Sequence, residues 1–180
     1  MSSVTISGDT SGSIILQAPA VSGSTTLTLP TTTGTLVTSN AMPTGSVLQV
    51  VNATYAVTTS NTSGSYVDSG LTASITPSSA SNKILVIVNQ LGCGKNGNTY
   101  MLARLKRSST VLAVLSGGSG YTNSTASNNF GGLGMTWLDS PATTSSTTYS
   151  TEFATAVATN QVYVQGNSEN STITLMEIKG

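Results

Sequence analysis

The chain has 180 residues, with six Lys and Arg, six Asp and Glu, no histidine and a single cysteine. So few charges exclude a basic patch that binds nucleic acid by neutralising phosphates, and they exclude a polybasic membrane anchor. The 37% of apolar residues come in short runs, far below the ~20 residues of a membrane-spanning helix. We therefore expect a folded protein with no nucleic-acid partner and no membrane insertion.

Residues 1–45 contain an internal repeat. Gly12, Gly23, Gly34 and Gly45 are spaced 11 residues apart, and each precedes Ser or Thr and an apolar run. Each unit predicts one short strand between a glycine turn and, in the first two units, a proline stop. The N-terminus lacks the basic start and apolar core of a signal peptide, so we expect synthesis in a cytoplasm.

One repeat unit offers only two or three large apolar side chains, too few to offset the entropy of ordering 11 residues. The segment must therefore stack on the rest of the chain or on copies of itself, and we favour intertwining about a threefold axis; a flexible tail is the alternative. The residues expected at this trimer interface are Ile14, Leu16, Leu27, Leu29 and Val47.

Residues 46–180 predict a larger β domain. Helical periodicity is nearly absent, and apolar β-branched runs alternate with turn signals. The expected strands cover residues 47–55, 66–75, 83–91, 100–107, 110–115, 133–138, 147–154, 161–164 and 172–178. The run Ile84 to Val88 is apolar at every position, which predicts a central strand covered on both faces. The fold class is all-β: a jelly-roll-like sandwich after a repeat segment.

No catalytic constellation is found. Without histidine the usual general base and metal ligand is missing, and one cysteine cannot form a Cys-based zinc site. Asp139 and Glu152 could meet across strands as a glycosidase pair, but isolated surface or turn carboxylates are expected. Cys93 predicts a small buried side chain. We expect no enzyme, no metal and no cofactor.

A long polar stretch, residues 116–132, predicts a loop. Its amides and aromatic rings suit sugar hydroxyls, and the candidate binding residues are Tyr121, Asn123, Asn128, Asn129 and Phe130. The competing interpretation is a solvated loop whose aromatic side chains fold back onto the domain. Trp137 is expected in the core or at a subunit seam.

The repeat from Gly12 to Val37, the phrase Met42 to Gln49 and the closing Ser171 to Ile178 resemble bacteriophage fibre proteins. The resemblance implies a homotrimer with a jelly-roll head like those of tumour-necrosis-factor and complement-C1q domains. It also implies a place on the virion, where the N-terminal region meets other virion proteins and the head meets host polysaccharide.

About 45 repeat residues at ~3.3 Å each make only a stub, so a capsid head fibre or decoration protein is the alternative to a tail fibre. A glycan-degrading spike is a third hypothesis, which the scarcity of carboxylates disfavours.

Overall fold

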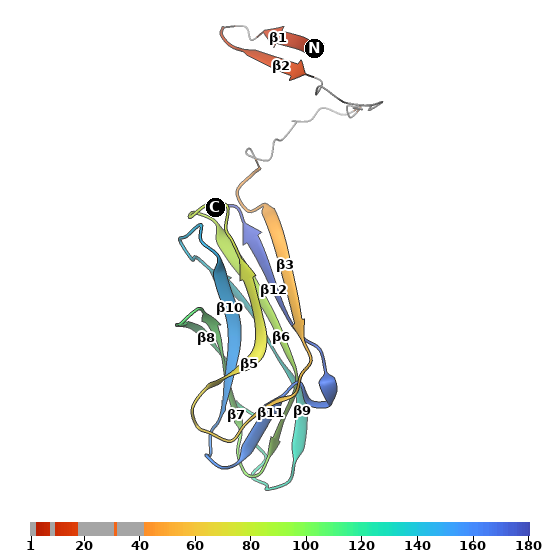
Figure 1. The fold of residues 1–180 in the computed structure, drawn as a ribbon, viewed down its shortest axis with the longest axis vertical. Helices are drawn as coiled ribbons and strands as arrows, with labels where there is room; N and C mark the ends of the chain where they lie inside the picture. The colour runs from red at the N-terminus through yellow and green to blue at the C-terminus, as the bar shows by residue number, and fades with distance from the viewer. Residues whose placement is uncertain (1–2, 8–9, 18–30, 32–41) are drawn as a thin grey trace. The chain divides into compact units, whose positions relative to one another are not determined.

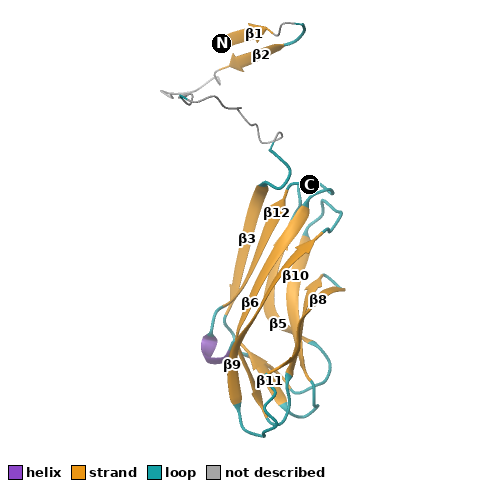
Figure 2. Ribbon diagram, turned by 180° about the vertical axis from the view of Figure 1, so that it is seen from behind, coloured by secondary structure: helices purple, strands orange, loops and turns teal. Residues whose placement is uncertain are grey.

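A computed structural model describes residues 3–7, 10–17, 31 and 42–180. The chain divides into two compact units, Met1–Thr38 and Ser39–Gly180. The strands, in chain order, are β1 Ser3–Ser7, β2 Ser13–Gln17, β3 Val47–Tyr55, β4 Thr59–Asn61, β5 Val67–Ile75, β6 Lys83–Asn96, β7 Met101–Arg107, β8 Thr110–Ser119, β9 Asn128–Asp139, β10 Thr147–Thr155, β11 Gln161–Val164 and β12 Ser171–Ile178 (Figure 1). The described residues hold no α-helix, and Figure 2 shows only the short 3-10 turn η2, Gly166–Ser168.

The N-terminal unit contains an antiparallel hairpin. β1 and β2 pair from Ser3 opposite Gln17 to Ser7 opposite Ser13. Val4, Ile6 and Ile15 are each more than half exposed. A two-stranded hairpin is at best marginally stable alone in water.

The repeat segment stays a prediction, and the structure describes strands at two of its units. The unit that begins at Gly12 forms β2, and the unit at Gly45 leads into β3. β1 was not expected. The units at Gly23 and Gly34, with Leu27 and Leu29, lie outside the described residues, and the threefold intertwining stays a prediction.

The C-terminal unit is built from two antiparallel sheets. The first sheet has four strands, in the order β5-β10-β7-β8. The second has six: five follow the order β3-β12-β6-β11-β4, and the sixth, β9, pairs with the edge of β6 that faces away from β12. Their apolar faces enclose two core clusters. The first includes Leu71, Val86, Leu105, Tyr149 and Leu175, and the second includes Met101, Phe153 and Val162. The all-β prediction is confirmed, and the two layers are those of a β-sandwich.

All nine predicted strands are present, but three are longer than expected. β6 continues to Asn96, β8 to Ser119, and β9 begins at Asn128. These extensions are rich in glycine and polar residues and lack the alternation that marks a strand. The β6–β9 ladder, which continues down to Lys95 opposite Asn128, holds the extensions of β6 and β9. The extension of β8 pairs with β7, with Ser119 opposite Met101. The expected loop of residues 116–132 therefore shrinks to residues 120–127.

Two burial predictions need correction. Trp137 lies on β9 and is 38% exposed, so the core position is wrong, while the subunit seam remains untested. In β6, Ile84, Val86 and Val88 are buried between the sheets, but Leu85 and Ile87 on the other face are only partly buried. The strand is central, as predicted, yet the described residues cover only one of its faces.

Candidate functional site

The outer face of the six-stranded sheet carries an apolar row. Val50 on β3, Met176 on β12, Leu85 on β6 and Leu138 on β9 occupy consecutive positions of one register line across four strands. Val50 is 55% and Leu138 51% exposed, whereas Met176 and Leu85 are partly buried. Val47 and Ile178 pair in the next line and extend the apolar surface toward one end.

The rest of this outer face is nearly free of charged side chains. The line beside the apolar row consists of Asn52, Thr174, Ile87 and Thr136, and the Asn52 side-chain amide donates to the Thr174 hydroxyl at 2.8 Å. Among the outward positions of the four strands, Lys83 is the single charge. An apolar row with neutral amides and hydroxyls around it is the composition of a protein interface.

Glu177 anchors the strand that carries this row. Its carboxylate is 1% exposed on the inner side of β12, next in sequence to Met176. It accepts hydrogen bonds from Gln49 Nε2 (2.6 Å), from the Ser78 backbone N–H and hydroxyl (2.7 Å each) and from Asn82 Nδ2 (2.5 Å). Burial works to raise the pKa of Glu177, but these hydrogen bonds outweigh it and lower the pKa below the ordinary 4.5.

The residues predicted at a trimer interface fall in different places. Val47 lies on β3 at the margin of the outer face and is 46% exposed. Ile14 and Leu16 belong to β2, where their backbones pair with Ile6 and Val4; Leu27 and Leu29 are outside the described residues. The structure thus adds Val50, Leu85, Leu138 and Met176, four candidates that the sequence alone did not single out.

The predicted sugar-binding loop is brought together only in part. Tyr121 is exposed; its ring meets Tyr100 edge-on at 6.0 Å, and its hydroxyl donates to Asn123 Oδ1 at 3.3 Å. Phe130 instead packs against the second core cluster, and Asn129 Oδ1 accepts from the Gly131 backbone N–H.

Asn128 sits in the ladder opposite Lys95, a buried lysine whose Nζ donates to the carbonyl oxygens of Gly97 and Ser124 at 2.9 Å. Lys95 therefore holds the loop in place through its hydrogen bond to Ser124. Nothing in the sequence distinguished this lysine from a solvated turn residue. Of the five predicted residues, only Tyr121 and Asn123 meet at the loop surface.

Two carboxylates expected on the surface are buried and paired instead. Asp139 accepts two hydrogen bonds from Arg107 Nη1, at 2.7 and 3.0 Å, and one from the Tyr149 hydroxyl at 2.7 Å. Burial, followed by this bond to Asp139, raises the pKa of the Tyr149 phenol. The interpretation of Asp139 as a plain turn residue is wrong, because its oxygens form a partly buried ion pair that joins β9 to β7.

Glu152 is held by other groups. Arg104 contacts one of its oxygens at 2.6 Å and Lys106 binds the other, while the Arg104 guanidinium lies 3.9 Å above the Tyr66 ring. Burial works to raise the pKa of Glu152, but hydrogen bonds from Lys106 and Arg104 and their charges lower it overall. Asp139 and Glu152 have separate cationic partners. They therefore join different pairs of strands and do not face each other as a carboxylate pair.

Cys93 is fully buried, as predicted. Burial, with a smaller effect from the Glu169 charge, raises the pKa of its thiol from 9.0 to about 12. Across the described residues, no three Cys, Asp or Glu side chains gather in a way that could hold a metal ion. No helix of the described part of the chain is long and apolar enough to cross a membrane.

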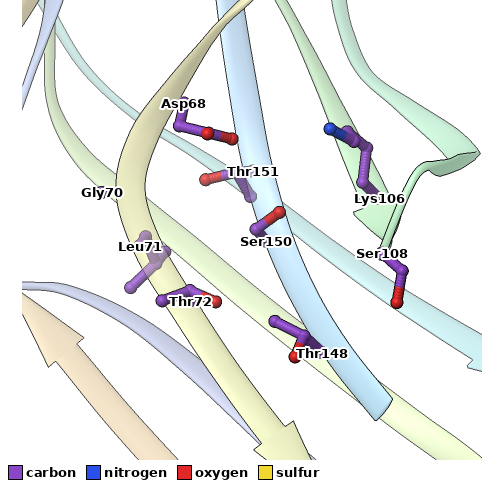
Figure 3. A pocket seen from close by; sticks show the side chains of 9 residues that line it. All are labelled: Asp68, Gly70, Leu71, Thr72, Lys106, Ser108, Thr148, Ser150 and Thr151. Carbon is purple, nitrogen blue, oxygen red and sulfur yellow. The ribbon is translucent and has the colours of Figure 1, made fainter.

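A shallow basin of about 380 Å³ lies on the outer face of the other, four-stranded sheet. It crosses β5, β10 and β7 and is lined chiefly by hydroxyl side chains, with one carboxylate, Asp68, and one ammonium group, Lys106 (Figure 3). Nothing in the sequence marks this basin, because its residues come from three separate strands and an adjoining turn.

Comparison with known proteins adds no relative: no protein-family model matches the chain, and no curated protein is similar to it.

Proposed function

We propose that this protein is a virion structural protein of a bacteriophage, a homotrimeric tail fibre or spike subunit with a jelly-roll-like head. The N-terminal region attaches it to other virion proteins, and the head contacts polysaccharide on the host surface. The resemblance of the repeat and of the closing strand to fibre proteins supports this function. The observation that carries it is the apolar row on the outer face of the six-stranded sheet, where Lys83 is the single charge among the outward positions of β3, β12, β6 and β9.

This outer face fits a second copy of the chain. β6 has the sequence of a strand buried on both faces, yet the described residues bury only one. In a symmetric oligomer the same patch meets itself or its copies, so a charged patch would bring like charges together. The outward positions here contribute only Lys83, at the margin, and the whole chain has no net charge.

The hairpin of β1 and β2 supports assembly independently. Its apolar side chains Val4, Ile6 and Ile15 are exposed, and each of its two strands has one edge without a partner strand among the described residues. Unpaired strand edges accept further strands readily. Sister chains and a virion protein are the partners that this proposal assigns to the segment.

A capsid head fibre or decoration protein is the second candidate. The brevity of the repeat favours it, since about 45 residues at ~3.3 Å each build only a short stalk. Both candidates share the homotrimer and the virion location, and they differ in where the N-terminal region attaches.

Immunogold electron microscopy of purified virions tests the proposal, using antibody raised against residues 42–180. Label at the tail tip, together with antibody inhibition of adsorption to host cells, supports the fibre. Label over the capsid without inhibition supports the decoration protein. If mass spectrometry detects the chain in virions that bind no gold, the labelling is repeated with antibody to residues 1–41. If the chain is absent from virions, both candidates are overturned.

A further inference from the structure

The basin on the four-stranded sheet has the size and chemistry of a ligand site. Its volume, about 380 Å³, is within the roughly 300–1,000 Å³ of small-molecule pockets. Figure 3 shows Asp68 on β5 and Lys106 on β7 on either side of β10, which carries Thr148 and Ser150 between them. The β-ladders place Ser150 opposite both Thr72 and Lys106, so these side chains belong to one surface.

Several of these polar groups are free to bind a ligand. The Thr72 hydroxyl donates to the Tyr149 carbonyl oxygen at 3.1 Å, and Thr148 is paired with Ser74 at 2.8 Å. In contrast, the Asp68 carboxylate and the Ser108 and Ser150 hydroxyls have no hydrogen-bond partner among the described residues. The basin therefore presents an unoccupied anionic acceptor and two hydroxyls that can donate or accept.

The electrostatics of the basin favour a neutral ligand. Asp68 and Lys106 are its only charged lining residues, and together with the adjoining ion pair of Arg104 and Glu152 their charges sum to zero. The Lys106 ammonium group already binds Glu152, so it offers its remaining N–H groups as donors but no unpaired charge for a phosphate. A lone carboxylate is also too little for a metal ion, and the described residues form no metal-binding group.

We propose that this basin binds a neutral sugar residue of a polysaccharide. Neighbouring sugar hydroxyls donate to Asp68 and accept from Lys106 and Ser150, an arrangement in which one carboxylate fixes two hydroxyls at once. The assignment of the ligand to a host-surface polysaccharide rests on the proposed function. The site itself is distinct from the Tyr121 loop, because it lies on β5, β10 and β7.

Saturation-transfer NMR with the full-length assembled protein tests this site. The probes are methyl glycosides of glucose, galactose, mannose, rhamnose and N-acetylglucosamine, with mannan and galactan as polymers. At least one probe should bind, and Asp68→Asn should weaken its binding about tenfold or more through the loss of the anionic acceptor. Ser150→Ala should weaken it less, and Tyr121→Ala should leave it unchanged. Asp68 is exposed without a partner, so the thermal melting of Asp68→Asn should match that of the wild type.

Three results would overturn the assignment of the basin as a sugar site: no binding of any probe, binding that survives both Asp68→Asn and Ser150→Ala, or binding that Tyr121→Ala alone abolishes. Native mass spectrometry measures the assembly state of the same samples, and gold labelling of virions shows whether the chain is a virion protein. An assembled virion protein that binds no sugar defeats only this inference. A sugar-binding chain that is absent from virions defeats only the proposed function.

Discussion

Replacing Glu177 by glutamine should destabilise the head markedly, although the change is nearly isosteric. The buried carboxylate accepts four hydrogen bonds, all from neutral donors of Gln49, Ser78 and Asn82. A glutamine amide has one oxygen, so at least one donor would face an N–H group in a site that is closed to water.

The size of the effect follows from that arrangement. Leaving one buried polar group unpaired costs about 1–3 kcal/mol, and hydrogen bonds to a charged group exceed neutral ones by about 1 kcal/mol. If the amide oxygen takes the position with three donors, the NH₂ group faces Gln49 Nε2, which is also bound to the Thr76 carbonyl oxygen at 2.8 Å. We therefore expect Glu177→Gln to lower the free energy of unfolding by about 2–4 kcal/mol at pH 7.

Urea unfolding at a fixed protein concentration measures this difference between pH 3 and pH 7. The folded-state pKa of Glu177 lies below its ordinary value of 4.5, so its contribution is complete above that value and is lost as the pH falls through the folded-state pKa. The gap between wild type and Glu177→Gln should thus shrink in acid. Glu169→Gln is the matched control, because Glu169 is only partly buried and accepts one bond, from the Gly92 N–H at 3.1 Å. Equal effects of the two substitutions, or a gap that does not depend on pH, would refute this reasoning.

Two further predictions follow from local geometry. Gly70 has φ +84°, and an added Cβ would lie 2.2 Å from the Tyr55 ring, so Gly70→Ala should lower the melting temperature strongly. Gly117 has open space around it, so Gly117→Ala should leave the melting temperature unchanged. Similar melting curves for the two variants would contradict this prediction. Because burial raises the thiol pKa of Cys93 to about 12, a thiol reagent at pH 8 should react with it only at the rate of unfolding, and rapid labelling of the native protein would show that the site is open.

The strands were predictable where side chains alternate or cluster. The run Ile84 to Val88 is apolar at every position and identifies β6 directly. In β7, Met101, Ala103 and Leu105 alternate with other residues along the strand, and all three are buried. The extension of β9 from Leu133 back to Asn128 was not predictable, because backbone pairing with β6 builds it from glycine and asparagine. Local pattern therefore located the strands, while their ends depended on long-range pairing.

The candidate sites depend on register, which the sequence does not contain. Val50 and Leu138 lie 88 positions apart in the chain, and only the pairing of β3, β12, β6 and β9 places them in one row. Similarly, Asp68 and Lys106 share a basin because β10 separates β5 from β7 by one strand. The Asn, Tyr and Phe cluster of residues 121–130 was visible in sequence as composition, but Phe130 packs against the core and Asn128 lies in the β6–β9 ladder.

Native mass spectrometry of the full-length wild type and of Leu138→Asp tests whether the chain assembles through the outer face of the six-stranded sheet. Val114→Asp is the matched control, since Val114 is exposed on β8 of the other sheet. We expect the wild type and Val114→Asp to have three times the 18.2 kDa mass of one chain, and Leu138→Asp to shift toward the single chain. A wild-type mass of one chain, or a trimer that Leu138→Asp leaves intact, would show that this face is not the interface.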